Sequence, residues 1–340
     1  MVNYPQNCRY PRQALQVSIF LQPILWGKFF IYYTLGSLRN LSTRQFTNIK
    51  AVDGISFAIQ PGELVGYLGP NGAGRFTTIK MLTGLLVPTA GGVIVDKFIP
   101  WKQRKTYVAE IGAVFGQRTS LWWDLPLAES LDLLQHIYKF PPEKFSANLE
   151  KFRELFELNN FMDTPVRALS LGQRMRADIC AALLHNPKQL FLDEPTIGLD
   201  VVAKERIRRF IQHINKELGT TVLLTTHDLS DVEKLCKRVM IIDHGQLLYD
   251  GKLELLRERF GEKRQLVVDF VEDYDIVSVN GAEIVHHEGN RVTFQFTNQD
   301  ISASKFINQL SAKYRIRDIE VREPDIETTI CSIYEGRLLE

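Results

Sequence analysis

Short apolar runs alternate with amphipathic stretches between residues 51 and 251 of this 340-residue chain. GISFAI alternates as a half-buried strand does, and LVGYLG, IGAVFG, QLFLDE and TVLLTTH are short runs typical of buried strands. Helical patterns lie between them, the longest of which places on one face Val202, Ile207, Phe210, Ile211, Ile214 and Leu218. Buried strands that alternate with helices predict a mostly parallel sheet covered on both faces.

A helical insertion is predicted in the middle of this region. Residues 126–160 follow a helical pattern that Pro141 and Pro142 interrupt, and QRMRADICAALLHNP is a further helix that ends at its Asn-Pro pair. We therefore expect a helical subdomain at about residues 127–185, within a main domain that covers residues 46–255.

The pattern changes after about Gly261. The runs RQLVVDFV, AEIVHH and RVTFQFT alternate as antiparallel strands do, and SKFINQLSAKY has helical spacing. Residues 256–340 are therefore predicted to form a small α+β accessory domain.

The first 45 residues contain an apolar segment, ALQVSIFLQPILWGKFFIYYTLGSL. Polar residues and a proline interrupt it before it reaches the roughly 20 apolar residues that a membrane-spanning helix needs. We expect neither a signal peptide nor a membrane anchor here, but a first strand near Val17–Phe20 followed by an insertion.

Charge and cysteine content narrow the class of partner. Lys and Arg total 41 against 40 Asp and Glu, which leaves a net charge of +1, so bulk charge implies no nucleic-acid partner. The four cysteines are scattered without a C-x-x-C pair, which favours plain thiols over a metal site or a disulfide.

The most informative stretch is GPNGAGRFTTIKM, residues 69–81, which lies between a predicted strand and a predicted helix. Its glycines allow backbone N–H groups to converge on phosphate oxygens at the positive end of the helix. The pattern G-x-x-x-x-G-K-[ST] needs a lysine for the terminal phosphates and a hydroxyl for magnesium. This chain has Arg75 and Phe76 instead, which we expect to weaken nucleotide binding and to impair catalysis more.

Two acidic residues end the buried run LFLDEP. Asp193 is placed to hold magnesium and Glu194 to orient or deprotonate a water molecule, with helix capping as the alternative role for the pair. LSLGQ opens a helix with Ser170 and Gly172, whose hydroxyl and amide groups suit a phosphate but also suit an ordinary N-cap.

Together these motifs resemble the nucleotide-binding subunit of ATP-binding cassette (ABC) transporters. GPNGAGRFTT resembles the family's Walker A loop, GQRTS its glutamine loop, LSLGQRMR its signature, LFLDEPTIGLD its Walker B segment and D-loop, and TTHD its switch histidine. LWWDLP and DEPTIGLDVVAKERIR are similar to prokaryotic subunits that pair with ABC-2-type permeases. The implied fold is an α/β P-loop NTPase of the ABC-ATPase type, with a parallel sheet core, an antiparallel β subdomain and a helical subdomain.

The resemblance also implies roles for particular residues. Glu194, His227 and Gln117 would act in hydrolysis, and Asp193 and Gln117 would hold Mg²⁺. The residues implied to bind ATP are Gly69, Pro70, Asn71, Gly72, Ala73, Gly74, Arg75, Phe76, Thr77, Thr78, Phe46, Ser170, Gly172, Gln173 and Asp200. Phe46 would stack on the adenine, with Tyr32 or Tyr33 as alternatives and a plain core position as the other role.

The implied assembly is a head-to-tail dimer, with itself or with another ABC ATPase subunit, on integral-membrane permease subunits. Ser170 and Gly172 of one copy would complete the ATP site of the other, and Asp200 would signal between them. The implied location is the cytoplasm, peripheral to the inner face of the cell membrane. Trp122 and Trp123 follow the glutamine loop, where the family docks its permease, although packing within the helical subdomain is the alternative.

Three functions stay open from the sequence. The first is an ATPase that drives a membrane transporter, and the second is a nucleotide-binding subunit with little or no turnover. The third is a soluble cassette ATPase that acts on nucleic acid or ribosomes, which the near-neutral charge disfavours. Glu194 and His227 favour hydrolysis, whereas Arg75 and Phe76 oppose it.

Overall fold

The computed structural model describes residues 15–18, 50–116, 118–260, 264–274, 279, 281–296, 301–322 and 326–334. The chain forms two compact units, Met1–Asp250 and Gly251–Glu340. The division thus falls near residue 250, where the sequence predicted 255, and the first strand belongs to the first unit.

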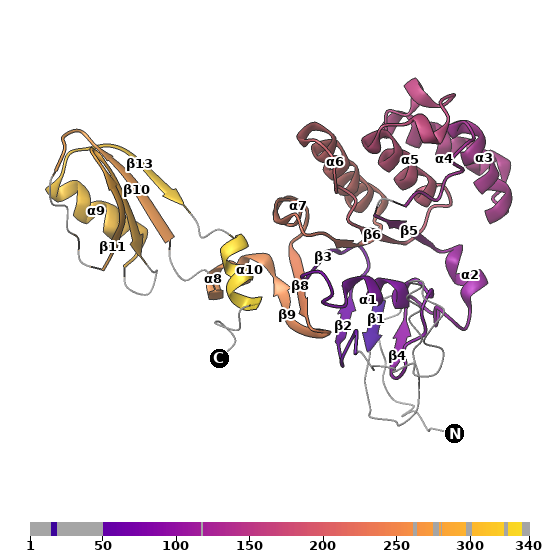
Figure 1. The fold of residues 1–340 in the computed structure, drawn as a ribbon, viewed down its shortest axis with the longest axis horizontal. Helices are drawn as coiled ribbons and strands as arrows, with labels where there is room; N and C mark the ends of the chain where they lie inside the picture. The colour runs from indigo at the N-terminus through magenta and orange to yellow at the C-terminus, as the bar shows by residue number, and fades with distance from the viewer. Residues whose placement is uncertain are drawn as a thin grey trace, which may run out of the picture. The chain divides into compact units, whose positions relative to one another are not determined.

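A six-stranded sheet in the order β5-β6-β7-β3-β8-β9 forms the centre of the first unit (Figure 1). The strands are β3 (Leu64–Leu68), β5 (Ile111–Phe115), β6 (Gln189–Asp193), β7 (Thr221–Thr225), β8 (Arg238–Asp243) and β9 (Gln246–Lys252). The four pairs from β5 through β8 are parallel, which confirms the predicted parallel core. Every residue of β3 and β7 is buried, as expected for strands covered on both faces.

The order of the strands determines where the predicted site residues meet. β6, β7 and β3 are neighbours, and their carboxyl ends lead into Glu194, Thr226 and Gly69 respectively. Parallel strands end at the same edge of their sheet, and ligands of open α/β sheets bind at that edge. The three loops are therefore brought together by topology.

A second, antiparallel sheet has the order β2-β1-β4, with β2 at Ser56–Ile59, β1 at Leu15–Ser18 and β4 at Gly92–Ile94. Val17 lies opposite Phe57 on one side and Val93 on the other. The predicted first strand exists, but it lies two residues earlier than expected. Phe57 and Val93 are buried in one core cluster with Tyr67 of β3 and Ile79, so the two sheets share a hydrophobic core.

The described part of the first unit also contains helices. They are α1 (Arg75–Leu82), α2 (Arg104–Val108), α3 (Leu127–Tyr138), α4 (Pro142–Leu155), α5 (Leu171–Leu183), α6 (Val201–Leu218) and α7 (Leu229–Leu235), with 3-10 turns at Asn159–Phe161 and Val166–Ala168. The Pro141-Pro142 pair separates α3 from α4, and Pro142 occupies the first turn of α4, where its missing N–H has no helical partner to lose. α3, α4 and α5 occupy the range predicted for the helical subdomain.

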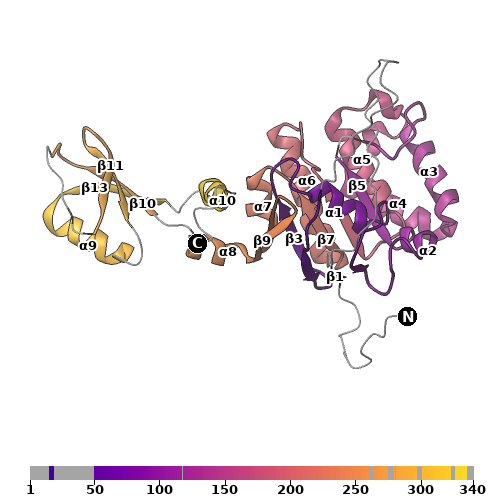
Figure 2. The same ribbon diagram turned by 60° about the horizontal axis from the view of Figure 1, so that its bottom comes forward.

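The second unit contains a four-stranded antiparallel sheet in the order β11-β12-β10-β13. The strands are β10 (Arg264–Phe270), β11 (Glu283–Glu288), β12 (Arg291–Phe296) and β13 (Ile316–Arg322). Helix α9 (Ala303–Lys313) packs on one face, where Phe306 meets Phe294 and Phe296. Figure 2 shows β10, β11 and β13 of this sheet together with helix α9. Helices α8 (Leu253–Phe260) and α10 (Ile326–Tyr334) complete the described part of this unit.

Two further features of the structure concern membrane crossing and the cysteines. Among the described residues, no helix combines the length and the apolarity that crossing a membrane requires. Cys180 and Cys236 are buried free thiols, and Cys331 is an exposed one.

Candidate functional site

A cavity of about 730 Å³ lies at the edge of the sheet where β3, β6 and β7 end. It is lined by Ala51, Gly69, Pro70, Asn71, Gly72, Gly74, Arg75, Phe76, Thr77, Asp193, Glu194, Ile197 and His227. Residues separated by more than 150 positions in the chain thus meet here, and most of the residues predicted to contact the phosphates and the metal are among them. We call this space the first cavity.

The backbone of the glycine-rich loop, Gly69–Gly74, has the conformation that only glycine adopts easily. Gly72 and Gly74 have φ angles of +87° and +106°. A Cβ atom on Gly74 would lie 2.4 Å from the carbonyl oxygen of Ala51, whereas one on Gly72 would meet nothing within 4 Å. The loop is therefore tightly packed at Gly74 and open at Gly72. Gly74 is also the N-cap of α1. This geometry fits the phosphates of a nucleotide.

Arg75 stands where the sequence pattern has a phosphate-binding lysine, and it contacts oxygens of the protein itself. Its buried guanidinium donates from Nη1 to Oε1 of Glu194 and to the backbone oxygen of Thr226, both at 3.1 Å. The side chain therefore neutralises the carboxylate that was predicted to act on water. The motif alone does not predict this contact, because it relates the position of Arg75 only to phosphate.

Phe76 places a ring where the sequence pattern has a hydroxyl group. The ring is 43% exposed, packs edge-to-face on Phe115 with centroids 6.3 Å apart, and lies beneath Lys80, whose Nζ is 4.0 Å from the ring centre. Thr77 lines the first cavity, but Thr78 is buried, and its hydroxyl donates to the backbone oxygen of Gly74. Thr78 and Ala73 were predicted to bind ATP, and neither side chain lines the cavity.

The two residues predicted to act on water are in contact. Nδ1 of His227 lies 2.7 Å from Oε2 of Glu194, so the two oxygens of Glu194 are shared between His227 and Arg75. Glu194 has a φ of +52°, in the left-handed region that residues other than glycine rarely occupy. This carboxylate is therefore held by both of its oxygens and by an unusual backbone conformation.

Asp193 offers an oxygen ligand at the end of β6. Burial raises the pKa of its carboxyl group, and the hydroxyl of Thr225, which donates to Oδ1 at 2.5 Å, opposes that rise. Glu194 raises the pKa of Asp193 further, whereas Arg75 and Lys80 lower it. A carboxylate suits Mg²⁺, but the ring of Phe76 contributes no oxygen, so the fit to the metal is incomplete on that side.

The predicted signature residues lie at a second cavity of about 340 Å³. Ser170 is the N-cap of α5, where its hydroxyl accepts from the backbone N–H of Gln173 and its own N–H donates to the Gln173 side chain. Asp200 is the N-cap of α6 and accepts from the N–H of Ala203 at 2.8 Å. Ser170, Gly172, Gln173 and Asp200 line this second cavity and none of them lines the first. Within one copy of the chain, the signature does not complete the site.

Some predicted residues lie outside the described part of the chain. Gln117 and Phe46 are among them, as are the alternatives Tyr32 and Tyr33. Their expected roles stay predictions.

The segment after residue 117 is held against α5 by a buried carboxylate that the sequence analysis missed. Oδ1 of Asp178 accepts from the hydroxyl of Thr119 at 2.8 Å and from the backbone N–H of Ser120 at 3.0 Å. Burial raises the pKa of Asp178 to about 6, and these hydrogen bonds oppose the rise. The only signal in the sequence was an acidic residue between two apolar ones in the helix.

We expect the Asp178→Asn variant to change how stability depends on pH. Because the pKa of Asp178 in the folded protein, about 6, exceeds the ordinary value of about 3.9, the stability it contributes is present at low pH and is lost as pH rises through about 6. The amide does not titrate. From pH 4 to pH 7 the variant should therefore gain unfolding free energy relative to the parent, on the order of 2–3 kcal/mol.

Urea unfolding of both proteins at unit steps of pH measures this change. The substitution Asp163→Asn is the matched control, because it makes the same change of carboxylate to amide at an exposed position. A difference between Asp178→Asn and the parent that is the same at every pH would contradict the prediction.

The fold and the first cavity define a P-loop nucleotide-binding protein, and comparison with known proteins narrows the class. Residues 52–197 match the family model described as "ABC transporter". The chain is 36% identical to the ABC transporter ATP-binding protein NatA of Bacillus subtilis, over 62% of this chain and 85% of NatA. It is 29% identical to the linearmycin resistance ATP-binding protein LnrL of the same species, over 85% of this chain and 94% of LnrL.

Comparison with solved structures leads to the same family. The structure of an ATP-binding subunit of an ABC transporter matches with a TM-score of 0.57 and 26% identity, over 62% of this chain and 87% of that one. The dimeric cassette MJ0796 bound to ADP and Pi matches with a TM-score of 0.55 and 26% identity, over 71% of this chain and 97% of that one. The chain belongs to the family of ABC transporter ATP-binding proteins, as its motifs predicted.

Proposed function

We propose that this chain binds and hydrolyses ATP in a head-to-tail dimer and thereby drives a membrane permease. The observation that carries the proposal is the contact of Glu194 with His227, 2.7 Å apart, in the same cavity as the glycine-rich loop. A carboxylate held beside a histidine at the phosphate site is the arrangement that water activation needs. The family of the chain supports ATP as the nucleotide.

The proposal gives separate roles to the glycine-rich loop and to the charged residues of the first cavity. The backbone N–H groups of Gly69–Gly74 bind the phosphates, and Glu194 accepts a proton from the attacking water. His227 orients that carboxylate through its contact with Oε2 of Glu194. Asp193, with Gln117, would hold Mg²⁺, which supplies positive charge to offset the charge on the phosphate oxygens. We expect the adenine to stack on Phe46.

The dimer follows from the separation of the two cavities. Ser170 and Gly172 are at the N-terminal end of α5, which suits an anion, yet they line only the second cavity of their own copy. A second copy in head-to-tail orientation would supply them to the first cavity. Val201 and Val202, at the start of α6, are 80% and 64% exposed, and burial of this apolar pair favours association through this face.

The permease would dock beside the glutamine loop, which places the chain at the inner face of the cell membrane. Trp122 and Trp123 are 39% and 50% exposed, and exposed aromatic side chains are typical of protein interfaces. Trp123 also lies under Arg174 of α5, with the guanidinium 5.2 Å from the ring centre. A permease segment that packs on Trp123 would therefore contact the helix that Ser170 begins.

Arg75 and Phe76 slow turnover in this proposal. Arg75 holds Oε1 of Glu194 in an ion pair, so that oxygen is already occupied when a water molecule approaches the carboxylate. Phe76 supplies no oxygen to magnesium. Both effects act on the hydrolytic step more than on the binding of phosphates by the backbone.

The test is steady-state phosphate release by the purified chain, with and without its permease, against the Glu194→Gln variant. We expect release that depends on Mg²⁺, exceeds that of the variant and rises when the permease is present. Phosphate release equal to that of Glu194→Gln under both conditions would replace the proposal with a subunit that binds nucleotide without turnover.

A further inference from the structure

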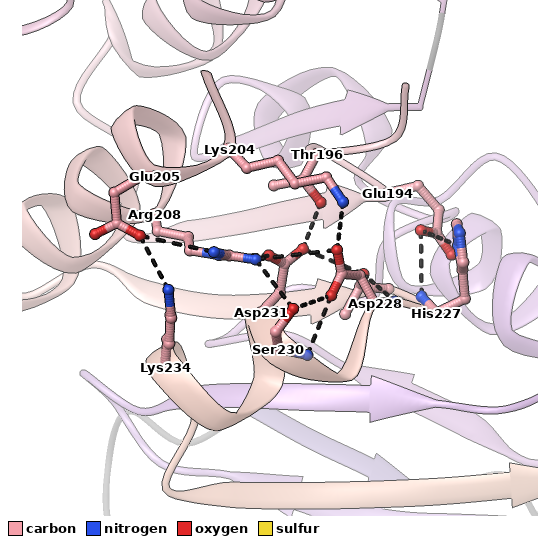
Figure 3. Close-up of polar contacts among 11 residues, drawn as sticks. Glu194, Thr196, Lys204, Glu205, Arg208, His227, Asp228, Ser230, Asp231 and Lys234 are labelled. Atoms are coloured by element: carbon pink, nitrogen blue, oxygen red, sulfur yellow. Dashed lines mark hydrogen bonds and ion pairs between the residues drawn. The ribbon is translucent and has the colours of Figure 1, made fainter. Parts of the chain in front are cut away.

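A polar network behind the first cavity converges on Asp231 of α7, whose side chain is fully buried (Figure 3). Its Oδ1 accepts from Arg208 of α6 at 2.6 Å from Nε and 2.5 Å from Nη2. Its Oδ2 accepts from the hydroxyl of Thr196 and, at 3.4 Å, from that of Thr226. A buried carboxylate needs such partners, because leaving it unpaired is strongly unfavourable.

The two threonines that donate to Asp231 lie close in sequence to Glu194 and His227. Thr196 lies two residues beyond Glu194, after β6, and Thr226 immediately precedes His227, after β7. One carboxylate therefore joins the two chain segments that carry the Glu194–His227 contact. Thr226 is fixed further, because its hydroxyl also accepts from the N–H of Asp228 at 3.0 Å.

Arg208 anchors the network to helix α6. Its side chain is 7% exposed, and α6 also contacts α7 through Lys204, whose Nζ pairs with Asp228 at 2.5 Å. α6 begins immediately after Asp200 of the D-loop. The ion pair thus ties the D-loop helix to the same carboxylate that holds the segments around Glu194 and His227.

The backbone of Glu194 gives a reason for this arrangement. Its φ of +52° is unfavourable for a residue with a side chain and persists only where the surroundings impose it. Glu194 donates its N–H to the Thr225 oxygen at 2.9 Å, and Thr196 is tied to Asp231 two residues later. A buried ion pair is in itself weak evidence for a role in stability.

We propose that Asp231 is a positioning residue for ATP hydrolysis: through Thr196 and Thr226 it holds Glu194 and His227 at their working separation, with Arg208 as its anchor. The inference rests on the proposed ATPase function. Asp231 touches neither the first cavity nor the glycine-rich loop, so its effect falls on the catalytic step and leaves the binding of ATP unchanged.

The decisive comparison is Thr196→Val with Thr196→Ser. Valine has the shape of threonine without the hydroxyl, whereas serine keeps the hydroxyl and loses a methyl group from a position that is 2% exposed. We expect Thr196→Val to lower kcat by about tenfold or more at an unchanged KM for ATP, since loss of a supporting hydrogen bond typically costs about 10–100-fold in activity. Thr196→Ser should keep most of kcat.

A role of Thr196 in packing alone predicts the opposite order, because serine loses a buried methyl group and valine does not. Lys234→Gln is the matched control: it breaks an exposed contact between the same two helices, Lys234 with Glu205 at 3.3 Å, without reaching Thr196 or Thr226. We expect it to leave kcat within about twofold of the parent.

Crystal structures of both Thr196 variants give a readout that does not need turnover. We expect the Glu194–His227 contact to be lost in Thr196→Val and kept in Thr196→Ser. An intact contact in Thr196→Val, or a kcat equal to that of an active parent, would overturn the inference. A parent no faster than Glu194→Gln would instead refute the proposed hydrolysis, and the two structures would then decide the role of Asp231.

Discussion

The double variant Arg75→Lys with Phe76→Ser should hydrolyse ATP about 100-fold faster than the natural chain or more, because each change should lower the barrier by an amount on the order of a few kcal/mol. Serine returns an oxygen for magnesium and removes a ring from a polar cavity. Lysine returns a point charge for the terminal phosphates and removes the guanidinium that pairs with Glu194 at 3.1 Å.

The two changes should couple, since both act on one phosphate group. We expect Phe76→Ser alone to recover more than Arg75→Lys alone. Arg75 is already a cation at the cavity, although it pairs with Glu194, whereas Phe76 offers no oxygen, and the hydroxyl of Thr77 lies one position further along α1. Initial rates of phosphate release at saturating MgATP measure all three proteins.

Adding Glu194→Gln to the double variant is the control, and it should remove the gained activity. A natural chain that already turns over as fast as the double variant would show that the loop tolerates Arg75 and Phe76. Our account of how these residues slow turnover would then be wrong.

The Glu194→Gln variant should form a dimer when ATP is added. An amide cannot accept the proton of the attacking water, and removal of a general base typically lowers turnover by about 10²–10⁴-fold. ATP that is bound but not consumed would keep the first cavity of one copy joined to Ser170 and Gly172 of the other.

Light scattering with and without MgATP measures this association as an approximate doubling of mass. Glu143→Gln, an exposed change of the same chemistry on α4, is the matched control and should behave as the parent does. If Glu194→Gln stays monomeric with ATP, even combined with Arg75→Lys and Phe76→Ser, the shared-site mechanism fails.

The sequence predicted most of the first unit because its signals are local. Apolar runs that end at Gly69, Glu194 and His227 identify strands, and the glycine-rich loop is recognisable wherever it occurs, since only glycine accepts its backbone angles. Parallel strands end at one edge of their sheet, so the predicted parallel core also brings these loops together. The six-stranded sheet and the first cavity show that arrangement.

Other elements had weaker local signals. Strand β8 was not identified, although it pairs with β3 at the centre of the sheet, and β13 of the second unit was missed as well. β13 is mostly exposed and rich in charged residues, so it lacks the alternation that reveals a strand. Its place in the sheet follows from pairing with β10, which is a tertiary property.

By itself the sequence determined the family, the glycine-rich loop and the acidic pair at the end of a buried strand, because backbone conformation and hydrophobic pattern depend on neighbouring residues. Only the tertiary structure decided the partners of the charged side chains. Arg75 turned to Glu194, 119 positions away, and Asp231 was placed between Thr196, Thr226 and Arg208. A long charged side chain contacts the opposite charges that the fold places near it. A buried carboxylate needs hydrogen-bond donors, which come from the different elements packed around it.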